Sequence, residues 1–293
     1  MNREESRPVQ FTKMSGAGND FVVVDNRTGQ VADPPDFARR ICHRRFGVGA
    51  DGLLLLERSE RADFAMRYYN ADGSYGGMCG NGGRCISRFA FENNAVSSRE
   101  MKFEALDFMY RAKMLDGGVR LWMKDPSDFR LHRSIELGRS TVNFHFVNTG
   151  SPHCILFMDE NRHLGTALDG IDVDSLGREI RNHRIFAPEG TNVTFLEKKA
   201  ESLFVARTYE RGVEEETLAC GTGAVASAVV ARSVKGAAAP VKIRVKSGEE
   251  LIVGFVVNDR GDFREITLEG SAHISFRGTV HYNSATHSIA DIS

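Results

Sequence analysis

Two stretches of this chain, Cys-Gly-Asn-Gly-Gly at residues 79–83 and Cys-Gly-Thr-Gly-Ala at residues 220–224, share one pattern. Each places a cysteine before a glycine-spaced turn, and each turn leads into a helix-like run, residues 84–91 and 225–231. A thiol at the N-terminus of a helix is favoured as thiolate by the free N–H groups and the helix dipole. Two such thiols at matching positions suggest a pair that acts on opposite faces of one substrate.

The sequence before the two cysteines repeats as well. Residues 56–69 and 196–209 run in step at a constant offset of 140, which becomes 141 at the cysteines because one residue is inserted. Asn70 and Glu210 therefore occupy equivalent places before their loops. Chance similarity of two amphipathic strands is the alternative, but strand, loop and cysteine turn recur in the same order. The repeat predicts two similar units.

Length and composition agree with two domains. The chain has 293 residues, of which 41% are hydrophobic, enough to bury two cores. Breaks in the pattern near residues 125–128 and 137–139 place the expected boundary there. We expect a first domain at residues 1–125 and a second at residues 126–271. The segment from about 272 to 293 could pair back onto the first domain.

Charge and cysteine usage exclude several classes of partner. The net charge is −1 and the sequence pI about 6.8, so neither nucleic acid nor an anionic membrane is an expected partner. No apolar run reaches the length of a membrane span, and residues 1–7 are too polar for a signal peptide. Five cysteines, an odd number, indicate reduced thiols in the cytoplasm. A homodimer is compatible with the sequence.

The remaining patterns predict mostly β structure with the two central helices that follow the cysteines. A further helix is expected after Pro34, turns at residues 116–118 and 258–262, and a frayed tail at residues 284–293. The predicted strands are residues 21–26, 53–57, 64–70, 109–115, 119–123, 142–147, 154–158, 193–196, 203–209, 241–245, 251–257 and 264–269.

Glycine-rich segments at residues 15–20 and 47–52 do not lead into helices. A dinucleotide fingerprint is therefore weakly supported, and no Gly-Lys-Ser/Thr sequence follows that would make a phosphate loop. Residues 148–153, like residues 15–20, suit either a backbone folded around a small ligand or a tight turn. Cys42-His43 has no second pair at zinc spacing, so we expect no metal and no cofactor.

The other cysteines are expected in the core. Cys85 and Cys154 lie in apolar surroundings, and Cys42 is expected to pack on a helix. A cysteine hydrolase that pairs Cys79 or Cys220 with His153 stays open, although it does not explain why the cysteine motif occurs twice.

These motifs, in this order, resemble the diaminopimelate epimerases, cofactor-independent enzymes that interconvert LL- and meso-2,6-diaminopimelate for lysine and peptidoglycan precursors. The family fold that the resemblance implies is α/β (α+β): two pseudo-symmetric domains, each a β-barrel-like sheet around a central helix, with the active site in the interdomain cleft. The matching stretches are residues 11–21, 70–74, 78–82, 149–154, 189–193, 209–212 and 219–223.

The resemblance also implies roles for single residues. Cys79 and Cys220 would be the acid/base pair, and His153 and Glu210 would support catalysis near them. The residues implied in binding the reacting α-carboxylate through backbone N–H groups are Gly80, Asn81, Gly221 and Thr222. Those implied in holding the ammonium groups and the distal carboxylate are Asn19, Asn70, Asn192, Glu210 and Arg211.

Inverting an α-carbon requires that a proton leaves one face and another returns to the opposite face. A thiolate on one side and a thiol on the other perform this without moving the substrate. Without pyridoxal phosphate, the carbanion charge must flow into the α-carboxylate, and two helix N-termini are suited to stabilise it.

Three positions depart from the family pattern. Gly52 stands where many members have a side-chain amide that touches substrate, and Ser151 stands where asparagine is common. Residues 213–216 make the loop before Cys220 one residue longer than the commonest form. We therefore leave Gly52 and Ser151 out of the expected site.

Three other readings stay open. Proline and hydroxyproline racemases share the fold and the paired cysteines, but they typically carry histidine where this chain has Asn81. A racemase of another amino acid, such as histidine, is the stronger rival. A binding protein without catalysis is the third, and retention of Cys79 and Cys220 argues against it.

Overall fold

The chain divides into two compact units in a computed structural model that describes residues 6–138, 140–283, 285–286, 288–290 and 292. Unit 1 comprises Met1–Leu121 and Ser271–Ser293, and unit 2 comprises Trp122–Gly270. The predicted boundary at residues 125/126 lies close to this division. Of residues 1–7, which are too polar for a signal peptide, residues 1–5 lie outside the described residues.

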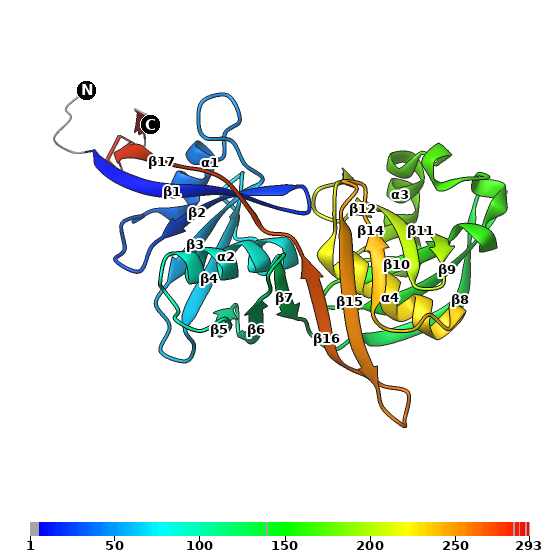
Figure 1. The fold of residues 1–293 in the computed structure, drawn as a ribbon. Coiled ribbons are helices and arrows are strands. Elements are labelled where there is room, and N and C mark those ends of the chain that lie inside the picture. Colours follow the sequence, from blue (N-terminus) through cyan, green and yellow to red (C-terminus); the bar gives the residue numbers. More distant parts are fainter. Residues whose placement is uncertain (1–5, 139, 284, 287, 291, 293) are drawn as a thin grey trace. The chain divides into compact units, whose positions relative to one another are not determined.

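Unit 1 is built on strands that surround one helix, α2 (Figure 1). This helix packs on β1, β2, β3, β4 and β6, and most of its residues are buried. The elements are β1 Arg7–Gly16, β2 Asn19–Asp25, α1 Pro34–Ile41, β3 Gly52–Glu57, β4 Phe64–Asn70, α2 Gly80–Glu92, β5 Glu100–Ala105, β6 Phe108–Met114, β7 Val119–Trp122, β17 His273–Asn283 and β18 Ser288–Ala290.

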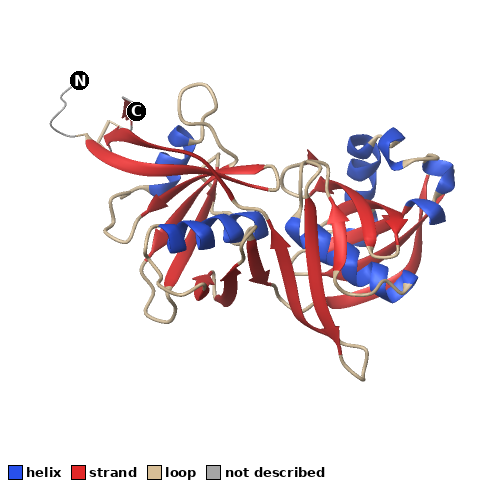
Figure 2. Cartoon of the chain, in the orientation of Figure 1, coloured by secondary structure: helices blue, strands red, loops and turns tan. Residues whose placement is uncertain are grey.

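Unit 2 repeats this plan around α4, which packs on β9, β10, β11, β12, β14, β15 and β16 (Figure 2). The elements are β8 Ser127–Leu137, β9 Ser140–Asn148, β10 Pro152–Phe157, η2 Met158–Glu160, η3 Arg162–Leu164, η4 Leu168–Gly170, α3 Val173–Arg181, η5 Arg184–Phe186, β11 Asn192–Ala200, β12 Leu203–Glu210, β13 Glu215–Thr217, α4 Gly221–Lys235, β14 Val241–Arg244, β15 Glu250–Val257 and β16 Phe263–Gly270.

The strand register repeats between the units residue by residue. In unit 1, Leu53 pairs with Tyr69 across β3 and β4, and in unit 2, Val193 pairs with Tyr209 across β11 and β12. Both pairs differ by the offset of 140 found in the sequence. The parallel neighbours repeat too: β4 joins β5 as β12 joins β14. The predicted α/β fold of two similar units, each with a helix among strands, is confirmed.

Each unit has a buried core of its own. In unit 1, Val9, Phe37 and Val280 belong to one cluster, which joins β17 to the N-terminal strands. In unit 2, Phe195 and Tyr209 pack with the strands that precede them and with α3. Core side chains on alternating or continuous strand positions account for the apolar runs read in the sequence.

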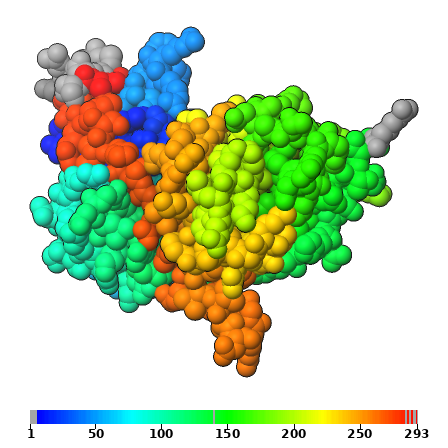
Figure 3. Space-filling model, turned by 45° about the vertical axis from the view of Figure 1, so that its right-hand side comes forward, coloured from blue at the N-terminus to red at the C-terminus, as the bar shows by residue number. Residues whose placement is uncertain are grey.

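The β15–β16 hairpin is a prominent feature of unit 2 and projects from its body (Figure 3). Its turn is held by Asn258, whose N–H donates to the carbonyl of Asp262 at 3.0 Å, as the turn signal at residues 258–262 predicts. No helix among the described residues is both long enough and apolar enough to span a bilayer.

Several elements escaped the sequence patterns: β1, β5, β8, β13 and α3. The segment from about 272, which the sequence left free to pair back onto the first domain, forms β17 opposite β1. The prediction of a frayed tail at residues 284–293 was wrong for part of its length, because Ser288–Ala290 pairs with β17. Residues 284, 287, 291 and 293 lie outside the described residues. Residues 15–20 form a tight hairpin turn between β1 and β2. Strands such as β1 and β17 depend on partners that are far away in sequence, for example Val9 opposite Val280.

Candidate active site

The two motif cysteines occupy the same position in the two units. Cys79 is the N-cap residue of α2 and Cys220 is the N-cap residue of α4, and both have extended backbone. Cys220 is 5% exposed, whereas Cys79 is half-buried. Each thiol therefore stands at the positive end of a helix dipole, as the sequence predicts.

These two helices differ from α1 and α3 in how they begin. The carboxylates of Asp33 and Asp172 accept hydrogen bonds from the first turns of α1 and α3. Neither Cys79 nor Cys220 caps its helix by a side-chain hydrogen bond. The first turns of α2 and α4 thus lack the carboxylate that usually satisfies backbone N–H groups, and a ligand carboxylate can take that position.

In unit 1, the helix N-terminus is joined to the β1–β2 turn. The amide of Asn81 donates to Oδ1 of Asn19 at 2.5 Å, and Asn19 Nδ2 donates to Oδ2 of Asp51 at 3.2 Å. On the other side, the fully buried guanidinium of Arg84 donates to Oδ1 of Asn81 at 2.9 Å. The orientation of both asparagine amides is therefore determined by charged neighbours.

A cluster of charges supports this corner. Arg44 binds the carboxylates of Asp20 and Asp51, at 3.0 and 2.6 Å, and Lys13 binds Asp20 at 2.7 Å and the carbonyl of Gly49. Burial opposes ionisation of Asp20, but its hydrogen bonds and charge interactions with Arg44 and Lys13 outweigh burial and lower its pKa. The cluster therefore keeps Asp20 ionised and holds the chain on both sides of Asn19.

Asn70 lies at the same end of the sheet, because its Cα partner is Gly52, the first residue of β3. Its amide donates to Ser74 Oγ at 2.9 Å. A side chain at position 52 would collide with its neighbours: a Cβ would stand 2.4 Å from Cε2 of Tyr68 and 2.5 Å from the carbonyl of Tyr69. The ring of Tyr68 thus fills the space of the side chain that Gly52 lacks.

In unit 2, three side chains converge on the hydroxyl of Thr222. Its Oγ1 lies 3.0 Å from His153 Nε2, 3.1 Å from Ser151 Oγ and 3.6 Å from Cys220 Sγ. Gly223 leaves space for the cysteine side chain, because a Cβ there would stand 3.2 Å from Cys220 Cβ and 3.3 Å from its sulfur. The structure also brings Ser151, which we had left out of the expected site, into this group.

His153 is neutral in this environment. Complete burial, together with the positive charge of Arg211, lowers its pKa to about 3. Its position at the start of β10 matches that of Asn192, which stands beside it at the start of β11. A neutral imidazole donates a hydrogen bond from one ring nitrogen and accepts one at the other.

The end of β12 supplies the remaining predicted residues. The backbone N–H of Arg211 donates to Asn192 Oδ1 at 2.9 Å, and Asn192 Nδ2 donates to the carbonyl of Pro152. Glu210 accepts a hydrogen bond from Thr217 Oγ1 at 2.9 Å. Asn192, Glu210 and Arg211 therefore gather at the strand ends next to His153, as the expected site requires.

The acidic loop next to Arg211 does not use its guanidinium. Glu214 pairs with Arg181, and Glu216 pairs with Arg207 and Lys246. The Arg211 side chain itself donates to the carbonyl of Glu189 at 3.3 Å. This arrangement argues against the alternative in which Arg211 serves only to neutralise the loop.

The other cysteines behave as core residues. Burial raises the pKa of Cys42 to about 12 and raises that of Cys154 as well. All five cysteines are free thiols. The described residues contain no group of three or more His, Cys, Asp or Glu side chains that could hold a metal ion.

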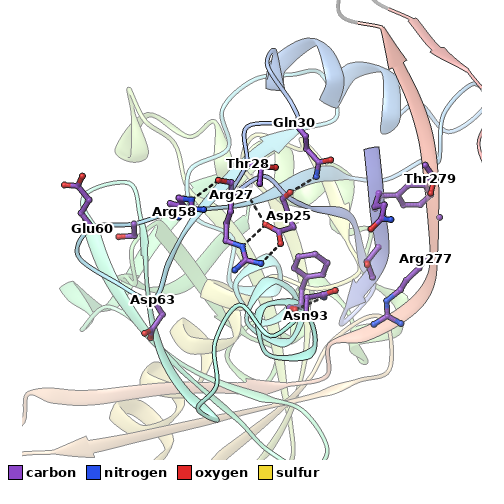
Figure 4. Close-up of a pocket in the computed structure, with 16 residues that line it drawn as sticks. Asp25, Arg27, Thr28, Gln30, Arg58, Glu60, Asp63, Asn93, Arg277 and Thr279 are labelled. Atoms are coloured by element: carbon purple, nitrogen blue, oxygen red, sulfur yellow. Dashed lines mark hydrogen bonds and ion pairs between the residues drawn. The ribbon is translucent and has the colours of Figure 1, made fainter. Parts of the chain in front are cut away.

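A groove of about 1360 Å³ lies elsewhere in unit 1, along β1, β17 and the C-terminal end of α2 (Figure 4). Arg27, Arg58 and Arg277 line it, and Arg27 is bound at 2.9 and 2.6 Å by Asp25. None of the residues predicted for the active site lines this groove. It lies about 20 Å along α2 from Cys79, judged from the helical rise.

Sequence reasoning missed the residues that orient the site: Asp51, Arg84 and Ser151. Asp51 and Ser151 lie in glycine-containing segments that we had singled out, residues 47–52 and 148–153. Arg84 gave no signal, because an arginine in a helix is usually solvated, whereas this one is fully buried.

The family model described as "Diaminopimelate epimerase" matches residues 11–108 and 145–272. The chain is similar to the diaminopimelate epimerase of Chlorobaculum tepidum, with 48% identity over 270 residues, 91% of this chain and 99% of that protein. It is 38% identical to the diaminopimelate epimerase of Aquifex aeolicus, over 92% of this chain and 97% of that protein.

Solved structures with the same fold are more distant in sequence. A hydroxyproline epimerase from Agrobacterium vitis matches with a TM-score of 0.68 and 17% identity, over 96% of this chain and 94% of that one. A PhzF-family phenazine biosynthesis protein from Bacillus anthracis matches with a TM-score of 0.69 and 13% identity, over 94% and 99%. At these identities the likeness concerns the fold alone.

Proposed function

The chain belongs to the diaminopimelate epimerase family, and we propose that it interconverts LL- and meso-2,6-diaminopimelate in the synthesis of lysine and peptidoglycan precursors. The observation that carries this proposal is a cysteine at the N-terminus of the buried helix in both units, Cys79 on α2 and Cys220 on α4. A single nucleophile would not require the second motif. Two bases are what inversion at one carbon requires.

In the proposed mechanism, one thiolate removes the α-proton and the other thiol returns a proton to the opposite face. The C–H bond breaks as an S–H bond forms, and the electron pair moves onto the α-carbon and into the α-carboxylate. The N–H groups of Gly80, Asn81, Gly221 and Thr222, at the two helix N-termini, would stabilise that negative charge. The absence of a side-chain cap at Cys79 and Cys220 supports this role.

The polar residues at the strand ends would select the substrate. In this proposal the amides of Asn19, Asn70 and Asn192 and the carboxylate of Glu210 hold the ammonium groups. Arg211 binds the distal carboxylate, for which a guanidinium offers a bidentate match. His153 and Glu210 support the chemistry from positions near Cys220.

The reaction needs no metal or cofactor in this mechanism, because the carboxylate itself accepts the charge. Turnover after dialysis against EDTA is therefore expected to be unchanged. We also propose that the enzyme works in the cytoplasm, where its five free thiols stay reduced. A racemase of another amino acid, of the histidine or proline type, is the rival function.

The deciding experiment follows α-proton exchange in D₂O with LL-diaminopimelate, proline and histidine in parallel. We expect deuterium at the α-carbon of diaminopimelate, with formation of the meso isomer, and no exchange with the other two. Exchange of proline or histidine instead would assign the rival function.

Single cysteine variants test the two-base mechanism. Cys79→Ala and Cys220→Ala are each expected to abolish epimerisation while circular dichroism stays unchanged. Cys42→Ala, which removes a buried thiol outside the site, is the matched control and is expected to keep turnover. Near-normal turnover in both directions by either site variant would contradict the mechanism.

A substitution of Arg211 tests whether the enzyme binds the distal carboxylate of diaminopimelate. Loss of a desolvated charged hydrogen bond costs about 2–4 kcal/mol, so Arg211→Met should lower kcat/KM on diaminopimelate by roughly 30- to 1000-fold. Thermal stability should not change, since the guanidinium makes only a long bond to the carbonyl of Glu189. A variant that melts earlier but keeps its kcat/KM would make Arg211 structural.

A further inference from the structure

The hydrogen bonds around Cys220 have a direction that can be worked out from their fixed ends. The amide of Asn192 is oriented by two backbone contacts: Oδ1 accepts from the N–H of Arg211, and Nδ2 donates to the carbonyl of Pro152. Nδ2 also donates to Ser151 Oγ at 3.4 Å. Ser151 Oγ is thus an acceptor on that side, and its own proton is available for Thr222 Oγ1, 3.1 Å away.

The tautomer of His153 follows from the same logic. The ring is neutral, and its Nδ1 is fully buried with no hydrogen-bond partner among the described residues. A buried acceptor without a partner is better tolerated than a buried N–H without one. We therefore assign the proton to Nε2, which lies 3.0 Å from both Thr222 Oγ1 and Ser151 Oγ.

His153 has a single N–H on this side, and either hydroxyl can accept it. In both cases the O–H of Ser151 has Thr222 Oγ1 as its acceptor. The acceptor that is left for the O–H of Thr222, among the described residues, is the sulfur of Cys220 at 3.6 Å. The main chain of Thr222 is held in place independently, because Thr149 Oγ1 donates to its carbonyl at 3.0 Å. The chain of donors therefore ends at the thiol.

We propose that the side-chain hydroxyl of Thr222 donates to Cys220 Sγ and stabilises the Cys220 thiolate, with Ser151 and His153 as positioning residues. The catalytic meaning of this assignment rests on the proposed epimerase function. In the step in which Cys220 acts as the base, the C–H bond breaks, the S–H bond forms, and the electron pair moves into the substrate carboxylate.

The two units differ at the position of Thr222. The place of Thr222 is taken in α2 by Asn81, whose amide donates to Asn19 and accepts from Arg84. The hydroxyl chain therefore belongs to unit 2. The charged group that acts on His153 is Arg211, and Glu210 precedes it at the end of β12; both are left unchanged in the test.

The test is a titration of thiolate absorbance at about 240 nm in a Cys79→Ser background, without substrate. Subtracting the same titration of Cys79→Ser/Cys220→Ser removes the signal of Cys42, Cys85, Cys154 and the tyrosines. Thr222→Val keeps the shape of the side chain and removes the hydroxyl. We expect about tenfold less Cys220 thiolate at a pH below the midpoint.

Thr222→Ser is the matched control, because it keeps the hydroxyl, and its titration should follow that of the parent. Ser151→Ala, which leaves the helix intact, is expected to lower the thiolate fraction by about threefold. An unchanged titration in Thr222→Val would overturn the proposal. So would an equal loss in Thr222→Ser, because it would indicate packing. Since no substrate is present, this result is independent of which amino acid the enzyme turns over.

Discussion

At the scale of single residues, Gly52 lies at a position where neighbouring atoms leave no space for a side chain. The ring of Tyr68 and the carbonyl of Tyr69 occupy the space of a Cβ at this position. Asn192 stands at the equivalent place in unit 2, where it orients Ser151 and Arg211. The two halves of a repeat can thus share a strand register and still carry different chemistry at one position.

Gly52→Ala is expected to lower the free energy of unfolding by about 1–3 kcal/mol, because the Tyr69 carbonyl cannot move aside. Urea denaturation measures the effect. Gly117→Ala is the control, since no atom lies within 4 Å of a Cβ there, and its change should stay within about 1 kcal/mol. Equal effects of the two changes would mean that Tyr68 relaxes freely.

His153 should make the protein sensitive to acid. Its folded pKa of about 3 is lower than the value of 6.5 for the free side chain, so the unfolded chain binds an additional proton between these values. Above pH 6.5 His153 is neutral in both the folded and the unfolded chain, so its protonation does not reduce the free energy of unfolding. As the pH falls below 6.5, the free energy of unfolding decreases by up to about 1.4 kcal/mol per pH unit.

Thermal unfolding of His153→Gln should therefore depend less steeply on pH between 6.5 and 4 than that of the wild type. The exposed His163, changed to glutamine, provides the control and should leave the slope as it is. If His153→Gln keeps the slope of the wild type, the acid sensitivity comes from other groups.

At the scale of elements, α2 is tied to the segment that returns from unit 2. Arg84 is fully buried and donates to the carbonyl of Ser271 at 3.2 Å and to Asn81 Oδ1 at 2.9 Å. Arg88, one turn later and partly exposed, donates to the carbonyl of Ala272 at 2.6 Å. The helix thus orients both the cysteine turn and the start of β17.

Arg84→Met is expected to destabilise unit 1 by about 2–4 kcal/mol, since it leaves buried acceptors without their charged donor. Arg88→Met should cost about 1 kcal/mol or less, because water can reach the acceptors it leaves. Chemical denaturation of the two variants compares them directly. If Arg84→Met lowers the free energy of unfolding less than Arg88→Met does, the structural role of the buried guanidinium is contradicted.

At the scale of the whole molecule, unit 1 is discontinuous in sequence. Val280 of β17 lies opposite Val9 of β1, and both are fully buried in the same cluster. The residues of the cluster described for unit 2 all lie within unit 2. A change inside one cluster is therefore expected to lower protection in its own unit first.

Hydrogen exchange detected by mass spectrometry tests this independence. Val280→Ala should cost about 2–3 kcal/mol and lower protection in residues 7–57, while residues 192–210 stay protected. Val253→Ala, in a fully buried position of β15, should do the reverse. Loss of protection throughout the chain in both variants would mean that the units unfold as one.

Local sequence determined the parts of this protein that depend on neighbouring residues. The repeat at an offset of 140, the two cysteine N-caps and most strands of each half follow from periodicity and from glycine-spaced turns. The helix N-termini could be located because their chemistry lies within a few residues. The family and the fold followed from the same motifs and are confirmed.

Tertiary structure alone decided what depends on distant partners. β17 pairs with β1 across most of the chain, and the sequence left this pairing only as a possibility, because no local pattern encodes which distant strand is the partner. Ser151 differs from the family pattern, yet its hydroxyl stands 3.1 Å from Thr222 Oγ1, which only the packing of β10 against α4 could reveal. The burial of Arg84 is likewise invisible in sequence, because it arises where α2 meets residues nearly two hundred positions away. Periodicity reports which face of an element is buried, whereas the hydrogen bonds that orient a site are made between elements.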